Sequence, residues 1–103
     1  MDKVYVCSPY GGDHKNLLYA QKCVLYVLKK GHAPFAPHLQ YGPVLNEDED
    51  RKLGMDAGNK WLRISDVVMV FADRGISPGM REEMATAREQ RIPIQTIKIE
   101  EFK

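Results

Sequence analysis

The sequence has little that would place the chain in a membrane, in a disulfide framework or on a nucleic acid. No apolar run approaches the roughly 20 residues that a membrane-spanning helix needs. The chain also enters an apolar strand pattern at once, without the layout of a signal peptide. The net charge is +1, with acidic and basic side chains interspersed. We therefore expect one cytosolic domain over residues 1–103 that binds no membrane and no nucleic-acid polymer.

Cysteine is scarce, and the common cofactor motifs are missing. The two cysteines, Cys7 and Cys23, lie in apolar segments without a Cys-x-x-Cys motif, so we interpret them as reduced core thiols. No spacing of histidine, cysteine and acidic residues fits a metal site, and neither GxGxxG nor a Walker A loop is present. We expect no metal and no cofactor.

Strand-like and helix-like segments alternate along the whole chain. The strand-like segments are 3–8, 32–38, 66–73 and 92–99, and the helical patterns run from about His14 to Lys30, from near Asn46, and from Ser77 to before Pro93. Segment 66–73 is nearly all apolar, as in a central strand, whereas the prolines of 32–38 indicate a sheet edge. This order predicts a three-layer α/β fold, Rossmann-like or flavodoxin-like, with a mainly parallel sheet of four to five strands.

The second helical pattern is expected to begin near Asn46. We expect acids 47–50 at its positive end and a buried stripe of apolar side chains, namely Leu53, Ala57, Trp61 and Ile64. Asp56 lies outside this stripe and can reach either a cleft or the solvent.

Ligands of open parallel sheets bind beyond the carboxyl ends of the strands. Three segments emerge there: "PYGGD" after the first strand, the segment around Pro37 and His38, and "DRGISPG" after the third. Any chemistry is expected where they converge. Each segment also has a purely structural interpretation: a turn with Asp13 as helix cap, a structural histidine at His38, and internal pairing of Asp73.

The third helix begins with Ser77-Pro78-Gly79. Serine is a favoured cap, proline suits the first helical position, and Gly79 lets a ligand approach the backbone. The free amides of such a first turn make an anion site. The alternative is simply a well-capped helix.

Two adjacent glutamates on this helix can be separated by its geometry. A helix advances about 100° per residue, and Met80, Met84 and Ala87 define the inward stripe. Glu82 falls nearly opposite this stripe, so we expect it at the surface. Glu83 falls on the flank of the stripe, where a carboxylate suits nucleophilic or acid–base work. A rim glutamate paired with Arg81, Arg88 or a neighbouring helix is the alternative.

Taken together, these motifs resemble the nucleoside 2-deoxyribosyltransferase-like superfamily, which includes 2′-deoxynucleoside 5′-monophosphate N-glycosidases. The matching stretches are "VYVCSPYGGD", "GHAPFAPHL", "WLRISDVVMVFADRGISPGMREEM" and "RIPI", which span nearly the whole chain in order. The resemblance is to short members, many of them carried by phages and mobile elements.

The resemblance implies a set of site residues. Glu83 matches the glutamate that attacks the anomeric carbon, Tyr5 matches a tyrosine beside it, and Ser77 matches a phosphate contact. The substrate-binding residues expected on this basis and from the converging loops are Ser8, Pro9, Tyr10, Gly11, Gly12, His38, Asp73, Ser77, Gly79 and Met80. The resemblance also implies a homo-oligomer, because related enzymes assemble their sites across subunits.

One position departs from the resemblance. Related active enzymes usually carry an aspartate on the second helix that protonates the leaving base or helps to position it, and alignment through Trp61 puts Gly58, or at best Asn59 or Lys60, there. Asp56 is the nearest acid: either it substitutes for this aspartate, or departure of the base is weakened, which would leave a binding protein.

Three functions therefore remain open. The first is an enzyme that cleaves or exchanges the N-glycosidic bond of a small (deoxy)nucleoside or its 5′-monophosphate. The second is a nucleotide-sensing or nucleotide-sequestering protein without turnover. The third is an interaction module with no small ligand.

Overall fold

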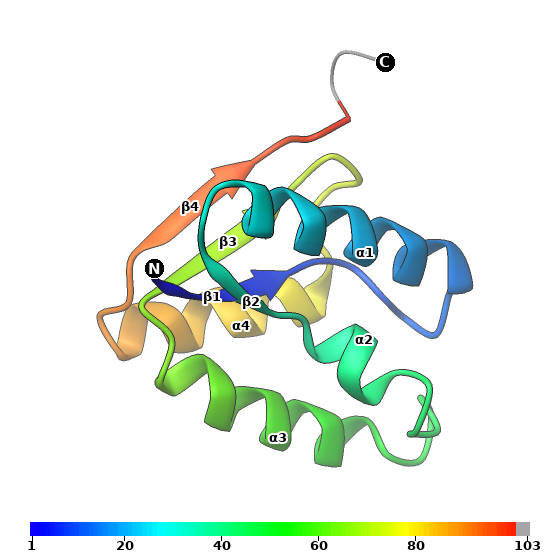
Figure 1. Ribbon diagram of the computed structural model, residues 1–103. Helices are drawn as coiled ribbons and strands as arrows, with labels where there is room; N and C mark the ends of the chain where they lie inside the picture. Colours follow the sequence, from blue (N-terminus) through cyan, green and yellow to red (C-terminus); the bar gives the residue numbers. More distant parts are fainter. Residues whose placement is uncertain (101–103) are drawn as a thin grey trace.

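The structure is a computed structural model that describes residues 1–100 as an α/β fold (Figure 1). The strands are β1 (Lys3–Cys7), β2 (Ala33–Phe35), β3 (Val67–Phe71) and β4 (Ile94–Ile97). They form one four-stranded sheet in the order β2-β1-β3-β4, and all three pairings are parallel. The predicted fold class is confirmed, with the proline-containing β2 at one edge and β3 inside the sheet.

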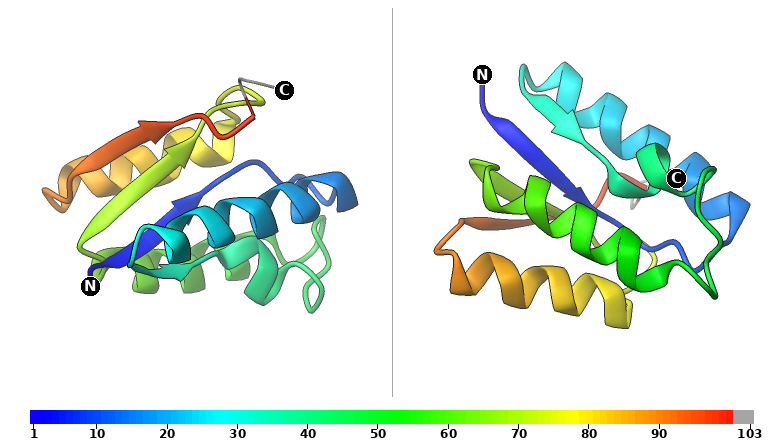
Figure 2. Two further views of the ribbon diagram at one scale, coloured as in Figure 1. Left: turned by 45° about the horizontal axis from the view of Figure 1, so that its top comes forward. Right: turned by 90° about the horizontal axis from the view of Figure 1, so that it is seen from below.

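Four helices accompany the strands: α1 (His14–Lys29), α2 (Pro37–Tyr41), α3 (Arg51–Arg63) and α4 (Pro78–Glu89). Helix α1 covers one face of the sheet, and α3 and α4 lie side by side on the other (Figures 1 and 2). The short α2 was not expected, because residues 32–38 read as strand and the following residues as loop. Pro37 occupies the start of α2, where the missing amide hydrogen costs nothing.

The alternation of side chains along β1 divides the core into two halves. Val4 and Val6 pack against α1, whereas Tyr5 and Cys7 face α3 and α4. All five residues of β3 are buried, because helices cover both faces of the sheet there. Tyr5 and Cys7 therefore lie on the same side of the sheet as α4.

The predicted orientation of α3 is wrong. Its buried residues are Gly58 and Leu62, whereas Leu53, Trp61 and Ile64 are 61%, 45% and 55% exposed. Trp61 is not core. Its ring stacks on Phe35 with a centroid distance of 5.1 Å, and its Nε1 donates a hydrogen bond to the Tyr41 hydroxyl.

The start of α3 also differs from the prediction. The helix begins at Arg51 rather than near Asn46, because the Asn46 side chain closes a separate turn by accepting hydrogen bonds from the amides of Asp48 and Glu49. Asp50 precedes the helix without making a side-chain cap. The acids of 47–50 thus form a loop beside the helix rather than its first turn.

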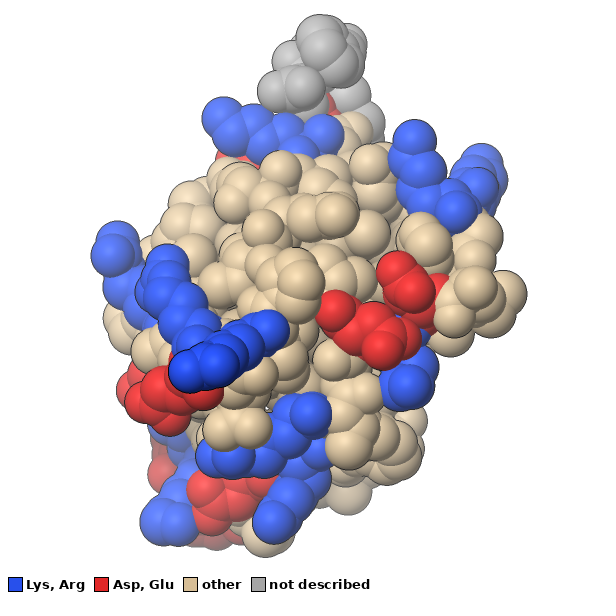
Figure 3. Space-filling model, turned by 90° about the vertical axis from the view of Figure 1, so that its left-hand side faces the viewer, with Lys and Arg blue, Asp and Glu red and all other residues tan. Residues whose placement is uncertain are grey.

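The surface bears mixed charges. Blue and red side chains surround a tan area on the face that Figure 3 shows, so this face carries no large patch of one sign. Within residues 1–100, no helix is long and apolar enough to cross a membrane. Cys7 and Cys23 are both buried free thiols, as predicted.

Candidate active site

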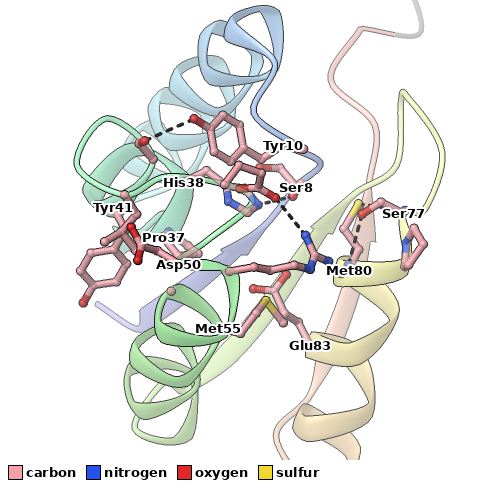
Figure 4. A pocket seen from close by; sticks show the side chains of 18 of the residues that line it. Ser8, Tyr10, Pro37, His38, Tyr41, Asp50, Met55, Ser77, Met80 and Glu83 are labelled. Carbon is pink, nitrogen blue, oxygen red and sulfur yellow. Dashed lines mark hydrogen bonds and ion pairs between the residues drawn. The ribbon is translucent and has the colours of Figure 1, made fainter.

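A cavity of about 330 Å³ opens at the carboxyl edge of the sheet (Figure 4). Residues from all three segments that follow β1, β2 and β3 line it, together with the loop after α2 and the first turns of α3. The volume falls within the range of small-molecule sites, about 300–1,000 Å³.

Helix α4 starts at the wall of this cavity, and its cap is the one expected from the sequence. The Ser77 hydroxyl accepts a hydrogen bond from the Met80 amide at 3.2 Å, and Pro78 is the first helical residue. Met80 and Ala87 are buried, as predicted for the inward stripe, and Glu82 is exposed. This orientation brings Glu83, one turn from the start of the helix, toward the cavity (Figure 4).

The Glu83 carboxylate is only 4% exposed and is held by two donors from β1. The Tyr5 hydroxyl donates a hydrogen bond to Oε2. The Cys7 thiol donates to Oε1 with an Sγ–O distance of 3.4 Å. Within residues 1–100, no ion pair joins Glu83 to Arg81 or Arg88, so the structure does not support the alternative of a salt-bridged rim glutamate.

Burial makes this carboxylate unusually basic. Desolvation raises the pKa of Glu83 to about 7, although the hydrogen bonds from Tyr5 and Cys7 favour its ionised form. Burial, and then the proximity of Glu83, raise the pKa of Tyr5 and of the Cys7 thiol well above their usual values. Both groups therefore keep their protons near neutral pH and act as donors.

The raised pKa has a measurable consequence for stability. Glu83 binds a proton more tightly in the folded protein than in the unfolded chain, so the stability it contributes is present below about pH 4.5 and is lost as the pH rises to about 7. We expect the free energy of unfolding to fall by about 3 kcal/mol over this interval through Glu83 alone.

Denaturant unfolding of the wild type and of Glu83→Gln at several pH values measures this contribution. Between about pH 4.5 and 7, the free energy of unfolding of the wild type should fall by about 3 kcal/mol more than that of Glu83→Gln, because glutamine does not titrate. Equal slopes for the two proteins would show that the Glu83 pKa is close to normal.

The loop after β1 is fixed by His38. The imidazole Nε2 donates to the Ser8 carbonyl oxygen at 2.7 Å, and the ring lies 5.2 Å from that of Tyr10 between centroids. Burial lowers the pKa of His38, so the ring is neutral and suited to this contact. His38 thus makes a structural contact with the loop after β1 and also lines the cavity.

The structure brings together most of the residues expected in the site. Those that line the cavity with Glu83 are Ser8, Tyr10, Gly11, His38, Ser77, Gly79 and Met80. Tyr5 lies behind Glu83 as its hydrogen-bond donor. Pro9, Gly12, Asp56 and Asp73 are not among the residues lining the cavity.

Two acids are placed away from the cavity by their own contacts. Asp56 is exposed and pairs with Lys52 at 2.8 Å, one turn away on the outer side of α3. Asp73 accepts hydrogen bonds from the Tyr19 hydroxyl at 2.6 Å and from the amides of Ile99 and Glu100. Asp73 thus ties the segment after β4 to α1, which is the internal pairing considered from the sequence.

Several residues of the cavity were missed from the sequence. Arg51, Glu47 and Asp50 line it from the start of α3 and the loop before it, and Met55 lines it from the next turn of α3. The available signal was the run of charge at 47–52. It was assigned to a helix end instead of a cavity wall, because the helix was expected to begin near Asn46.

Gly58 packs directly against Tyr5. A methyl group at Gly58 would lie 3.0 Å from the Tyr5 hydroxyl oxygen and 3.7 Å from the Pro37 Cβ. The Tyr5 ring thus fills the space beside Gly58. Gly58 is the residue that alignment through Trp61 first matches with the aspartate of related enzymes.

The fold is that of the nucleoside 2-deoxyribosyltransferases. The chain is similar to a 2-deoxyribosyltransferase from Bacillus psychrosaccharolyticus, with a TM-score of 0.75 and 18% identity over 93% of this chain and 72% of that one. It is similar to the CMP N-glycosidase BcmB of Clostridium botulinum, with a TM-score of 0.57 and 13% identity over 96% and 70% of the two chains. A 2-deoxyribosyltransferase from Leishmania mexicana gives a TM-score of 0.63 and 16% identity over 95% and 65%.

The sequence places the chain in a family as well. The model of the family described as Domain of unknown function (DUF7768) matches residues 2–97, and the chain belongs to that family. No curated protein matches the sequence significantly. Among residues 1–100, no group of three or more histidine, cysteine or acidic side chains is arranged to hold a metal ion.

Proposed function

We propose that the protein cleaves or exchanges the N-glycosidic bond of a small nucleoside or its 5′-monophosphate, with Glu83 as the nucleophile. The observation that carries this proposal is a buried carboxylate that lines a ligand-sized cavity, is hydrogen-bonded by Tyr5 and Cys7, and has a raised pKa. Similar structures include two deoxyribosyltransferases and a CMP N-glycosidase, which supports this class of reaction.

The proposed reaction has two steps. A Glu83 carboxylate oxygen attacks the anomeric carbon of the sugar, the bond from that carbon to the base breaks, and the base leaves with the bonding electrons and takes a proton from water. Water or a second base then attacks the same carbon and releases Glu83. A retaining glycosidase uses a carboxylate in the same way, through an oxocarbenium-like transition state. Tyr5 and Cys7 fix the orientation of the carboxylate between the steps.

One observation favours a second candidate, a nucleotide-binding protein without turnover. The resemblance leads to an aspartate on α3 where alignment through Trp61 puts Gly58, or at best Asn59 or Lys60, and the possible substitute Asp56 pairs with Lys52 at the surface. Without an acid in this place, departure of the base depends on water, which slows the first step.

A panel of deoxynucleosides and their 5′-monophosphates separates the two candidates. We expect free base to appear by chromatography during incubation with the purified protein, and we expect the same ligands to raise the melting temperature. Stabilisation without release of base would replace the enzyme by the binding protein. If no ligand of the panel releases base or raises the melting temperature, both candidate functions are contradicted.

Assembly into a homo-oligomer belongs to the same proposal. The exposed Leu53, Trp61 and Ile64 place apolar surface on the outer side of α3. Burial of such surface between copies of the chain would stabilise a domain of this size.

A further inference from the structure

Arg51 reaches across the cavity from the first residue of α3 to the first turn of α4. Its Nη1 lies 2.9 Å from Oε1 of Glu47, on the loop that precedes α3. A methyl group placed on Gly79 would lie 3.5 Å from Nη2 of Arg51 and 4.0 Å from the Ser77 hydroxyl oxygen. The guanidinium thus lies within van der Waals reach of the start of α4, close to Gly79 and Ser77.

Two independent features of this place favour an anion. Among the described residues that line the cavity, Arg51 is the one lysine or arginine. The amino end of α4 adds the positive end of a helix dipole, which favours an anion. Glu47, Asp50 and Glu83 also line the cavity and oppose an anion, so the preference for one depends on Arg51.

An unsatisfied hydroxyl lies in the wall of the same cavity. Ser8 is 1% exposed, and its Oγ has no hydrogen-bond partner among the described residues. Figure 4 shows Ser8 beside His38, on the wall formed by the loop after β1. Buried hydroxyl groups are normally hydrogen-bonded, so a ligand oxygen would supply the missing partner. Three polar groups from three different segments, Arg51, Ser77 and Ser8, therefore line the space that an anionic group would occupy.

We propose that Arg51 is a specificity-determining residue whose guanidinium binds a phosphate group of the ligand, so that the cavity takes nucleoside monophosphates in preference to uncharged nucleosides. The inference rests on the proposed function for the identity of the rest of the ligand. A phosphate matches the planar fork of an arginine with two parallel hydrogen bonds, and it carries more charge than the Glu47 carboxylate. The phosphate therefore takes the place of Glu47 at Arg51.

The test compares binding of the four deoxynucleoside 5′-monophosphates and of the four matching nucleosides by calorimetry. We expect the wild type to bind its preferred monophosphate at least about tenfold more tightly than the matching nucleoside, a difference typical of one charge-assisted contact. Arg51→Met should abolish this preference and leave the affinity for the nucleoside within about twofold. Arg63→Gln, at the opposite end of α3 and outside the cavity, is the matched control and should keep the preference.

Two further arms distinguish recognition from a structural role. Glu47→Gln leaves Arg51 unpaired and should raise the affinity for the monophosphate, whereas a purely structural ion pair would lose stability without this gain. Inorganic phosphate alone should compete with the monophosphate in the wild type and not in Arg51→Met. An unchanged preference in Arg51→Met, or equal binding of nucleoside and monophosphate by the wild type, would overturn the inference.

Release of base is recorded in the same samples, so the two proposals fail in different ways. Binding of monophosphates that depends on Arg51, without release of base, supports this inference and removes the enzymatic function. Release of base at equal rates from nucleosides and monophosphates, unchanged in Arg51→Met, supports the enzyme and removes this inference.

Discussion

Glu83→Gln should abolish release of base while the protein still folds and binds its ligand. Glutamine has nearly the size of glutamate and can still accept a hydrogen bond from Tyr5, but its amide cannot form an ester with the sugar. Loss of a nucleophile removes the covalent route entirely, so we expect kcat/KM to fall by at least about 10³-fold. Steady-state release of base and the ligand-induced rise in melting temperature are the two measurements.

The neighbouring glutamate provides the control for this prediction. Glu82 is exposed on the outer side of α4, so Glu82→Gln should keep release of base within about twofold of the wild type, as most surface substitutions leave a protein unaffected. Full activity in Glu83→Gln, or a large loss in Glu82→Gln, would show that the wrong carboxylate has been assigned.

Gly58→Asp should destabilise the protein instead of supplying the acid that related enzymes carry. The first carbon of any side chain at this position would lie 3.0 Å from the Tyr5 hydroxyl oxygen, and Gly58 itself is buried. An aspartate would therefore push Tyr5 away from Glu83 and bury a second carboxylate near the first. We expect the free energy of unfolding to fall by about 3–5 kcal/mol, through overpacking and burial of a charge.

Two variants separate these contributions in denaturant unfolding. Gly58→Ala adds the steric clash without the charge, and about 1 kcal/mol of gained helix propensity offsets part of the clash, so it should cost about 0–2 kcal/mol. Asn59→Asp places the same carboxylate one residue further along α3 and should cost less than about 1 kcal/mol, because this position is only partly buried. A Gly58→Asp protein that is as stable as the wild type and releases base faster would contradict the account of Tyr5 and Gly58.

The strands and α4 could be predicted because their patterns and their surroundings agree. Segment 66–73 is apolar throughout, and β3 is indeed covered on both faces. On α4, the apolar stripe faces inward, so helical geometry correctly separated the exposed Glu82 from the buried Glu83. The hydrogen bonds from Tyr5 and Cys7 to Glu83 could not be predicted from helical geometry, because they depend on which side of β1 faces α4.

Helix α3 was misjudged because its apolar side chains are not its inner ones. Leu53, Trp61 and Ile64 suggested a buried stripe, but Gly58 and Leu62 face the sheet. A glycine adds nothing to a hydrophobic pattern, yet here it defines the inner side by making room for the Tyr5 ring. Because Gly58 and Leu62 face the sheet instead of the apolar stripe, Asp56 lies at the surface.

Arg51 was missed for a related reason. The hydrogen bonds of the Asn46 side chain close a turn that ends at Glu49, two residues before α3 starts, and this break is not visible in the run of acids at 47–50. A helix starting at 46 would place Arg51 in its second turn, as one more charge at the surface. The true start at Arg51 aims its side chain across the cavity toward Gly79.

The identity of the nucleophile is tested most directly by mapping a covalent sugar adduct. The protein is incubated with 2′-fluoro-arabinosyl analogues of the substrates, whose electron-withdrawing fluorine slows breakdown of the ester, and its peptides are then weighed by mass spectrometry. We predict one sugar per chain on the peptide that contains Glu83 and none in Glu83→Gln. Release of base with no adduct on Glu83, or with an adduct on another residue, would contradict the assignment of Glu83 as the nucleophile.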